Sequence, residues 1–292
     1  MKRLEDKKDW IWLIHIPGVG GKRAMNLLER FKTPSQIRKA RKQELVQVKG
    51  IGGELAEKIT FFQEIEFDRR IQKEIQYMKK QQIHFITIEE KEYPDKLRQI
   101  YDPPIGIYVK GNTEILSKYG IGIVGCRNCS PYGERIAKKF SYELAQKGIT
   151  IISGLARGID SYAHIGCLMA EGRTIAVVGC GLDKVYPKEN LKLEQIILKK
   201  GGVIISEYPI GTPPLKMNFP ARNRIISGLA NGILVVEAKE KSGTLITVDF
   251  ALEQGKDVFI VPGNIDSENS TGTNRLIKEG AKMVTNIEDI LE

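Results

Sequence analysis

Residues 121–152 read IGIVGCRNCSPYGERIAKKFSYELAQKGITII and indicate the fold of the larger part of the chain. An apolar run ends at Val124, a helical stretch covers Tyr132 to Gln146, and a second apolar run covers Ile149 to Ile152. A strand, a helix and a second strand in this order predict a parallel pair, because a crossover helix returns the chain to the same end of the sheet.

The same alternation continues toward the end of the chain. Strand-like runs are Ile121–Val124, Ile149–Ile152, Thr174–Val178, Gly202–Ile205, Ile233–Val236 and Val258–Val261, and helical stretches between them include Tyr132–Gln146, Ala163–Glu171, Leu191–Lys199 and Leu245–Glu253. Short apolar strands that alternate with helices are typical of a parallel sheet covered on both faces. For residues 111–292 we therefore predict an α/β fold, an extended Rossmann-like, doubly wound and mainly parallel sheet.

Residues 67–110 are predicted to connect this sheet to a smaller domain. A charged helix from about Phe67 to Gln82 leads to a short strand, Ile83 to Ile88, that packs on the edge of the sheet. The prolines at 94, 103 and 104 exclude a regular helix through the segment that follows.

Residues 1–66 are predicted to form a small all-α domain. Two glycine turns, residues 18–20 and 50–52, each open an apolar helical stretch and form a weak internal repeat. The pattern resembles the SAM-like, helix-hairpin-helix domains of DNA-binding proteins. Amides at such turns can face a phosphate, but many domains of this kind are protein–protein modules, so both interpretations stay open.

The composition is that of a soluble globular protein, with 41% hydrophobic and 28% charged residues among 292. No apolar run has membrane-spanning length and no secretory signal begins the chain, so we expect a cytoplasmic location. The net charge is +9, and residues 1–80 alone hold 19 Lys+Arg against 11 Asp+Glu. This excess favours polyanions, although residues 38–42 are equally typical of a solvated helix.

The four cysteines include one C-x-x-C pair, Cys126 and Cys129. A zinc site needs a second pair or nearby histidines, and neither is present in the sequence around it. We expect small reduced thiols, no metal and no cofactor.

Ligands of doubly wound sheets bind at the carboxyl ends of the strands, and the unusual loops of this chain follow its predicted strands. Glycines and hydroxyls there let backbone amides approach an anion, and cations add charge. The residues expected to line such an anion pocket are Arg127, Ser153, Gly154, Gly158, Gly243 and Thr244, with Arg157, Lys184 and Lys188 as further cations.

Residues 216–224, KMNFPARNR, follow the fourth of these strands and stand before a helix expected to include Ile225 and Ile226. Arginine binds phosphate oxygens bidentately, lysine adds a point charge, and a phenylalanine ring offers a face for base stacking. The candidate DNA-binding residues here are Lys216, Asn218, Phe219, Arg222, Asn223 and Arg224. Alternatively, Phe219 is a core aromatic and the arginines pair with a carboxylate such as Glu237.

Common cofactor and catalytic motifs are absent from the sequence. The first strand is not followed by G-x-G-x-x-G, the second ends at Ser153 without an acidic residue, and no P-loop occurs. Asp160 and His164 stand at helical spacing for an acid–base pair, but we expect Asp160 to cap its helix and His164 to pack beside the pocket. No catalytic residue is assigned.

Together these loops resemble the DprA/Smf family of bacterial DNA-processing proteins. The segments that carry the resemblance are 123–127 (IVGCR), 153–160 (SGLARGID), 219–226 (FPARNRII), 242–247 (SGTLIT) and 261–263 (VPG). The resemblance implies a non-enzymatic protein that binds single-stranded DNA without sequence specificity and helps to load the RecA recombinase during natural transformation. It also implies a homodimer through the Rossmann domain, with segments after Lys256, including Leu276, Ile277 and Met283, as candidates for the interface.

The family pattern carries over to individual positions with two departures. It implies that Arg127, Lys216, Phe219, Arg222 and Asn223 line the DNA pocket, with Lys188 as a more peripheral cation. Cys126 stands where many members have Ser or Thr, which removes one hydroxyl contact to phosphate. The chain ends at Glu292 without the winged-helix domain of some members, so functions of that domain are not expected.

Two other function classes are weighed against DNA binding. A nucleotide phosphoribohydrolase shares a similar Rossmann domain, but Thr247 stands where its catalytic glutamate is expected, which leaves no evident general acid or base. A protein–protein adaptor would use the helical domain as its docking surface.

Overall fold

The central feature of the computed structural model, which describes residues 3–63 and 65–292, is a nine-stranded sheet. The strands are β1 (Ile83–Thr87), β2 (Gly106–Gly111), β3 (Gly120–Val124), β4 (Thr150–Ser153), β5 (Thr174–Val177), β6 (Val203–Ser206), β7 (Gly232–Val235), β8 (Asp257–Ile260) and β9 (Lys282–Met283). Their order is β1-β2-β6-β5-β4-β3-β7-β8-β9. The pairs β1–β2 and β2–β6 are antiparallel, and all other neighbours are parallel.

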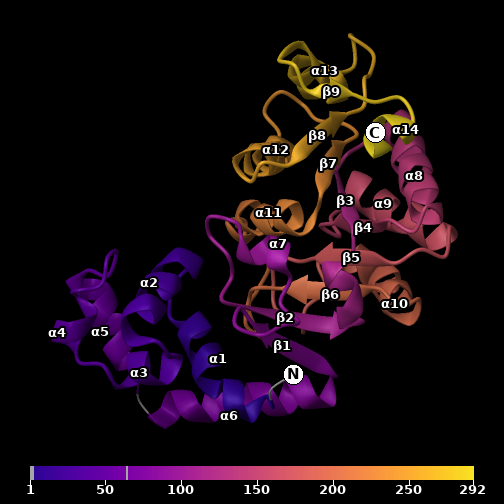
Figure 1. Cartoon of the computed structure of the whole chain (residues 1–292). Coiled ribbons are helices and arrows are strands. Elements are labelled where there is room, and N and C mark those ends of the chain that lie inside the picture. Colours follow the sequence, from indigo (N-terminus) through magenta and orange to yellow (C-terminus); the bar gives the residue numbers. More distant parts are fainter. Residues whose placement is uncertain (1–2, 64) are drawn as a thin grey trace.

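Helices cover both faces of this sheet (Figure 1). On one face lie α8 (Pro131–Gln146), α9 (Ile159–Met169) and α10 (Leu191–Lys199), and on the other lie α11 (Asn218–Leu229) and α12 (Gly243–Glu253). Because both faces are covered, every residue of β3 is buried, as expected for a near-continuous apolar strand. The predicted doubly wound, mainly parallel sheet is therefore confirmed. Two short helices, α13 (Thr271–Lys278) and α14 (Glu288–Leu291), complete the C-terminal part.

Helix α11 begins earlier than the sequence suggested. Residues 218–224, expected before the helix, form its first two turns. Pro220 is tolerated there because it is the third helical residue, and the first N–H groups of a helix have no intrahelical acceptor. The start of α9 likewise lies at Ile159 and not at Ala163.

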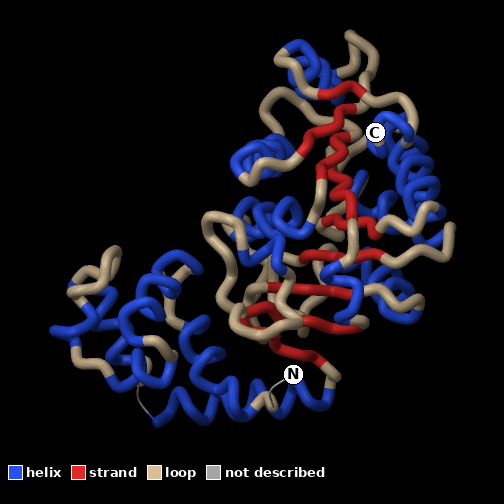
Figure 2. The backbone as a smooth tube through the Cα atoms, in the orientation of Figure 1, coloured by secondary structure: helices blue, strands red, loops and turns tan. Residues whose placement is uncertain are grey.

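The N-terminal unit is helical, as predicted, and consists of α1 (Lys8–His15), α2 (Gly21–Phe31), α3 (Pro34–Lys39), α4 (Lys42–Leu45) and α5 (Gly53–Phe61). Each predicted glycine turn ends at a helix N-cap, Gly20 for α2 and Gly52 for α5. The long helix α6 (Ile65–Lys80) then leads to the sheet, as Figure 2 shows. Residues 1–2, the start of the first predicted domain, lie outside the described residues.

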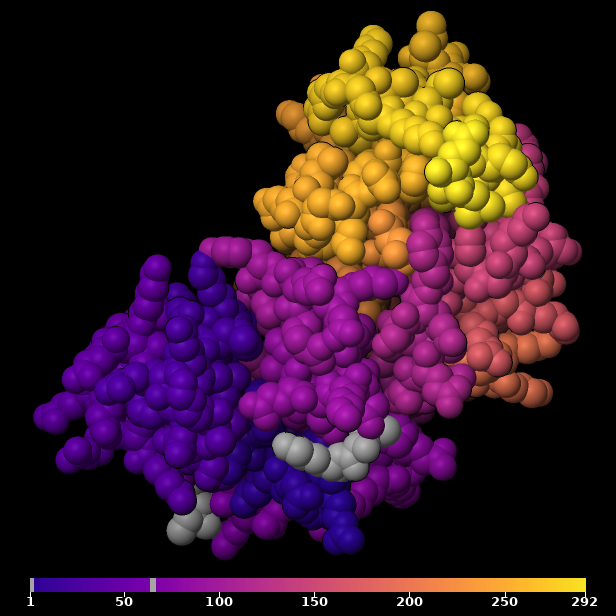
Figure 3. All heavy atoms as spheres, in the orientation of Figure 1, coloured from indigo at the N-terminus to yellow at the C-terminus, as the bar shows by residue number. Residues whose placement is uncertain are grey.

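Residues 81–111, nearly all of which were predicted to connect the two domains, also contribute two strands to the sheet. Both β1 and β2 extend it beyond β6, and one helical turn, α7 (Asp95–Arg98), lies between them directly after Pro94. In the space-filling view the N-terminal helices pack against this magenta segment (Figure 3).

Three further features concern possible ligands and membranes. Within the described residues, no helix is both long and apolar enough to span a bilayer. In the same part of the chain no three His, Cys, Asp or Glu side chains gather as metal ligands. All four cysteines are free thiols.

Lys7 joins the start of the helical unit to the sheet. Its ammonium donates to the Phe85 carbonyl at 2.5 Å and lies 2.8 Å from the Glu90 carboxylate, with the two side chains only 1% and 4% exposed. Removing one partner of a buried ion pair leaves the other charge in a desolvated place, and this costs far more than breaking an exposed pair.

Replacing Lys7 by alanine is therefore expected to lower the free energy of unfolding by about 3–5 kcal/mol. Lys8→Ala is the matched control, because Lys8 and its partner Asp68 are 30% and 27% exposed, and its effect should stay below about 1 kcal/mol. Urea unfolding followed by circular dichroism measures both. Equal effects of the two variants would contradict this role of Lys7.

Candidate functional site

A cavity of about 600 Å³ lies at the carboxyl ends of β3 and β7. From β3 the chain builds β4, β5 and β6 on one side, whereas β7 and β8 lie on the other, so the connections diverge and leave a crevice here. The cavity is walled by the loop after β3, by α11 with the residues before it, and by the loop between β7 and α12. Their lining residues are Gly125, Cys126, Arg127, Asn128, Lys216, Phe219, Arg222, Asn223, Lys239, Lys241, Ser242, Gly243 and Thr244.

Glu237 fixes the loop that carries Arg127. Its buried carboxylate accepts from the Ser130 N–H at 2.9 Å and from the Ser130 hydroxyl, and its carbonyl accepts from the Cys126 N–H at 2.9 Å. Arg127 stands between these anchors and is exposed. Its guanidinium carbon lies 5.4 Å from the centre of the Phe219 ring. Glu237 is thus a loop anchor and not the arginine partner that the sequence offered as an alternative.

Phe219 forms an aromatic pair at the edge of the cavity. Its ring centroid lies 5.3 Å from that of Tyr186, with 39° between the planes, and the ring packs on Gly179, where an added Cβ would be 3.1 Å away. Phe219 is only half-buried, so it is not a core aromatic. Tyr186, from the loop after β5, is 40% exposed. The sequence analysis did not include Tyr186 among the site residues, although an aromatic residue near Lys188 in a loop after a strand could have indicated a stacking position.

Arg222 lies under the cavity and holds two strand ends together. Its side chain is 4% exposed, and one Nη donates to the carbonyls of Gly154, at 2.6 Å, and of Val177. Its Nε is buried with no hydrogen-bond partner among the described residues. Burial lowers the pKa of Arg222, and the nearby charge of Arg127 adds to this, although Asp160 opposes it. Arg222 therefore has a structural role beneath the cavity, and its buried Nε is an unsatisfied donor.

Asp160 accepts hydrogen bonds from the glycine loop after β4. Its carboxylate is 3.1 Å from the Gly154 N–H and 3.4 Å from the Ala156 N–H. Burial raises its pKa, although Arg222 and these amides act in the opposite direction. Asp160 shapes the loop as an internal acceptor, whereas the N-cap of α9 is Gly158 and not Asp160 as expected.

His164 is fully buried and neutral. The Thr174 hydroxyl donates to the Ile151 carbonyl at 2.7 Å, so it can only accept from His164, whose Nδ1 is 2.7 Å away. The proton is therefore on Nδ1, and the bare Nε2 has no partner among the described residues. Burial, and secondarily Arg222, lower the pKa of His164 to about 3. A histidine in this state is a packed core residue and a poor general base near neutral pH.

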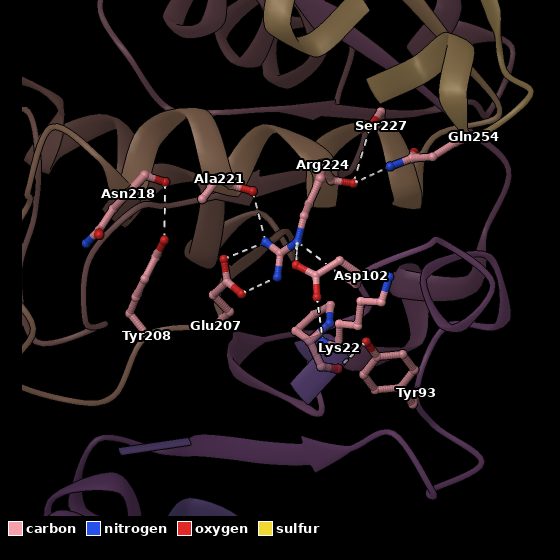
Figure 4. Close-up of polar contacts among 11 residues, drawn as sticks. Lys22, Tyr93, Asp102, Glu207, Tyr208, Asn218, Ala221, Arg224, Ser227 and Gln254 are labelled. Atoms are coloured by element: carbon pink, nitrogen blue, oxygen red, sulfur yellow. Dashed lines mark hydrogen bonds and ion pairs between the residues drawn. The ribbon is translucent and has the colours of Figure 1, made fainter. Parts of the chain in front are cut away.

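Arg224 points toward two carboxylates, and we leave it out of the candidate contacts (Figure 4). Its guanidinium makes two contacts with Glu207, at 2.7 and 2.5 Å, and its Nε is 3.2 Å from the Asp102 carboxylate. Burial lowers the pKa of Arg224, but these carboxylates outweigh it and raise the pKa overall. Arg222 and Arg224 point in different directions because residues two positions apart in an α-helix are rotated by about 200° around its axis.

Four other expected site residues lie outside the cavity lining, and three of them support the loops. The buried Ser153 hydroxyl donates to the Ile123 carbonyl at 2.7 Å, and the Asn218 amide donates to the Gly179 carbonyl at 3.0 Å. Gly158 has φ +72° and would place a Cβ 2.2 Å from the Cys126 carbonyl oxygen, so only glycine fits. Lys188 is exposed at the start of the 3₁₀ turn η3 (Lys188–Asn190), outside the cavity lining.

The cavity holds cations that sequence reasoning missed and few groups for catalysis. Lys239 and Lys241, from the loop between β7 and α12, line it. Among the described residues that line it, the one carboxylate is that of Asp160, whose Oδ2 accepts from two backbone amides. Thr247, where a phosphoribohydrolase has its glutamate, is 1% exposed and also lines the cavity. The arrangement is suited to binding an anion with an aromatic moiety, and it offers no evident acid–base pair.

Comparisons with known proteins show the family of the chain. A family model described as DNA recombination-mediator protein A matches residues 84–292, and one described as a SAM-like helix-hairpin-helix tandem matches residues 13–62. The chain belongs to the DNA recombination-mediator protein A family. The resemblance to DprA/Smf proteins that the loops indicated is thereby confirmed.

Three relatives illustrate the extent of the similarity. DNA processing protein DprA of Bacillus subtilis is 46% identical over 215 residues, which are 73% of this chain and 72% of that protein. The crystal structure of DprA from Streptococcus pneumoniae matches with a TM-score of 0.82 at 36% identity, covering 100% of this chain and 97% of that one. DNA processing protein A from Helicobacter pylori, studied for its single-stranded DNA binding mode, matches with a TM-score of 0.65 at 32% identity, covering 71% and 94%.

The buried state of His164 predicts a pH dependence of stability. With a pKa of about 3 in the folded protein and about 6.5 when unfolded, this histidine takes up a proton first in the unfolded state as the pH falls. Its contribution therefore destabilises the fold below pH 6.5, by about 2 kcal/mol between pH 6.5 and 5. Urea unfolding at both pH values tests this. Between pH 6.5 and 5 the free energy of unfolding of His164→Gln should fall less than that of the unmodified protein, by this amount.

The control for this measurement is His84→Gln, because His84 is exposed. The free energy of unfolding of this variant should change with pH as that of the unmodified protein does. Asp160, whose raised pKa acts in the opposite direction, is present in all three proteins and cancels in the comparison. An unaltered pH dependence in His164→Gln would show that His164 is not held neutral.

Proposed function

We propose that the chain binds single-stranded DNA, without sequence specificity, in the cavity at the ends of β3 and β7. The observation that carries the proposal is the group formed by Arg127, Phe219 and Tyr186, in which a cation and two aromatic rings meet at the cavity edge. Bases stack on such rings whatever their identity, and cations beside them bind the backbone phosphates. That the H. pylori relative has a described single-stranded DNA binding mode supports the same conclusion.

Phosphate contacts are assigned to the exposed cations and to the start of α12. Lys216 and Lys241 are exposed at the cavity, and Arg127 faces it from the loop after β3. Gly243 and Thr244 lie at the N-terminus of α12, where the helix dipole favours an anion, although the Ser242 hydroxyl already accepts from the Thr244 N–H. Asn223 lines the same wall from α11, and Arg222 adds positive charge from below.

The wider role proposed for the chain follows its family. We infer that it is not an enzyme, that it assists the loading of RecA onto single-stranded DNA during natural transformation, and that it acts as a homodimer through the Rossmann domain. The edge of the sheet supports the last point. β9 is the terminal strand of the order, and Met283 on it is 51% exposed, so a second chain can pair there.

Loss of Arg127 or Lys216 is expected to weaken DNA binding mainly through phosphate contacts. Arg127→Ala and Lys216→Ala should each reduce the affinity for oligo-dT and lower the slope of log affinity against log salt by about 0.7. Fluorescence anisotropy over a salt series measures both quantities. Lys192→Ala, the loss of an exposed cation on α10, is the matched control and should leave the slope unchanged. Unchanged slopes in all three variants would remove the cavity from the proposal.

The aromatic pair is expected to act through stacking and not through charge. Phe219→Ala and Tyr186→Ala should each cost about 1–3 kcal/mol of binding energy, a loss of about 5- to 150-fold, with little change in the salt slope. Phe219→Tyr and Tyr186→Phe keep a ring and should restore most of the affinity. If Tyr186→Ala binds DNA as the unmodified protein does, Tyr186 is not part of the stack.

Hydrolysis of nucleoside monophosphates is expected to be absent. Incubation with each of the common nucleotides and chromatography for released base tests this directly, and turnover that is lost in Asp160→Asn would favour the enzyme interpretation.

A further inference from the structure

The two glycine turns of the helical unit are equivalent in backbone conformation. Gly18 and Gly50 have φ values of +92° and +83°, and Gly20 and Gly52 are the N-caps of α2 and α5. In register, Gly21 therefore corresponds to Gly53, and Lys22 corresponds to Glu54. Turns of this kind leave the first N–H groups of the following helix without intrahelical acceptors.

The surroundings of the two turns differ completely. A Cβ added at Gly21 would lie 2.2 Å from the Pro103 carbonyl oxygen and 2.8 Å from the Asp102 carboxylate, whereas at Gly53 it would meet nothing within 4 Å. Gly21 is buried and Gly53 is exposed. The first turn is thus docked on residues 101–103 of the segment between α7 and β2, and the second faces solvent.

Asp102 occupies the position at the first turn that an anionic ligand would take. Its Oδ1 accepts from the Lys22 N–H at 2.7 Å, and the Lys22 ammonium lies 3.9 Å from the centre of the Tyr101 ring. Lys22 is the second residue of α2, so its N–H has no acceptor within the helix. A carboxylate there satisfies the amide and the helix dipole as a DNA phosphate would.

The second turn is unsuited to a phosphate for a different reason. Glu54 stands at the position that corresponds to Lys22, in the first turn of α5, and its side chain is 85% exposed. Its carboxylate pairs with Lys58, 2.6 Å away, and a negative side chain in the first turn of a helix disfavours a phosphate at the same end of the dipole. The first turn is therefore occupied, and the second, although exposed, carries an acidic side chain where the first carries Lys22.

The docked turn is also connected to the wall of the cavity. The Asp102 carboxylate that accepts from Lys22 is 3.2 Å from Nε of Arg224 on α11, and Arg224 is held by Glu207 directly after β6 (Figure 4). Helix α11 carries Phe219 and Asn223 on its other side. One carboxylate thus joins the helical unit to the helix that lines the cavity.

We propose that the first glycine turn is an intramolecular docking surface whose partner is the segment 101–103, and that the carboxylate of Asp102 takes the place of a DNA phosphate. The helical unit is then fixed to the Rossmann domain by a turn of DNA-binding type, and neither of its turns contacts DNA. This inference stands on the contacts of Gly21, Lys22 and Asp102 and does not depend on the proposed function of the cavity.

The test compares equivalent substitutions at the two turns of the full chain. Gly21→Ala forces a methyl group against the Pro103 carbonyl, and Gly53→Ala adds the same group in open space. Amide hydrogen exchange followed by NMR should show a rise of about tenfold or more in the exchange rate of the Lys22 amide in Gly21→Ala, and no change in Gly53→Ala. An unchanged Lys22 rate in Gly21→Ala, or an equal effect of Gly53→Ala, would overturn the docking.

A second variant keeps the test decisive if Gly21→Ala folds poorly. Asp102→Ala removes the acceptor of the Lys22 N–H together with one ion pair of Arg224. Because Arg224 keeps both contacts with Glu207 and its bond to the carbonyl of residue 102, the α/β fold is expected to be retained. The same rise in exchange at Lys22 is expected. Protection of Lys22 that survives in Asp102→Ala would show that the carboxylate is not its acceptor.

DNA binding supplies an independent measurement. Lys22→Gln combined with Lys49→Gln removes one cation from each turn and should change the affinity for single-stranded and duplex oligonucleotides by less than about twofold, whereas Lys216→Gln in the cavity should weaken single-strand binding several-fold. A loss of about tenfold in the double variant would overturn the assignment of the turns. If neither the double variant nor Lys216→Gln changes the affinity, the result contradicts the proposed function of the cavity and leaves the docking intact.

Discussion

Strands β3 and β7 are neighbours in the sheet, yet the chain leaves them toward opposite edges, and the rest of the site depends on this constraint. The connections that follow β3 extend the sheet through β4, β5 and β6, helix α11 then returns the chain to β7, and the connections that follow β7 extend the sheet through β8 and β9. No crossover helix can cover the point at which the two directions part. Loops from distant parts of the sequence therefore meet there, and Arg127, Phe219 and Lys241 line one cavity although more than 100 residues separate the first from the last.

Buried charge gives this meeting point its shape. Arg222 donates to the carbonyls at the ends of β4 and β5, and Asp160 accepts from the amides of the loop between β4 and α9. These backbone groups would otherwise face a desolvated interior without partners, which is costly. The glycine loop after β4 is thus held from inside by ionic side chains, which leaves the aromatic residues and the exposed cations to form the surface that a ligand meets.

The residues of 216–224 show how position within one helix separates function from structure. They share a cationic and polar character in the sequence, but α11 turns Phe219, Arg222 and Asn223 toward the cavity and Arg224 toward Glu207 and Asp102. Had the start of the helix been known, the rotation of 100° per residue would have predicted which of these side chains face the cavity and which face the two carboxylates. Pro220 lies in the first turn of α11, which accommodates it because no N–H is needed there.

The sequence alone determined the doubly wound sheet, the helical N-terminal unit, the strand-end location of the site and most of its cations, because these follow from local periodicity and from the rule that ligands bind at carboxyl ends of strands. It did not determine which polar residues face the cavity. Ser153, Asn218 and Arg224 are used inside the fold, and Tyr186 and Lys239 reach the cavity from loops whose course depends on distant contacts. Nor could the repeat of glycine turns reveal that one is covered, since Gly21 and Gly53 have the same local conformation and differ only in the packing of Pro103 and Asp102 against the first. Local sequence sets backbone conformation, and long-range packing decides which of the resulting amides and side chains remain available.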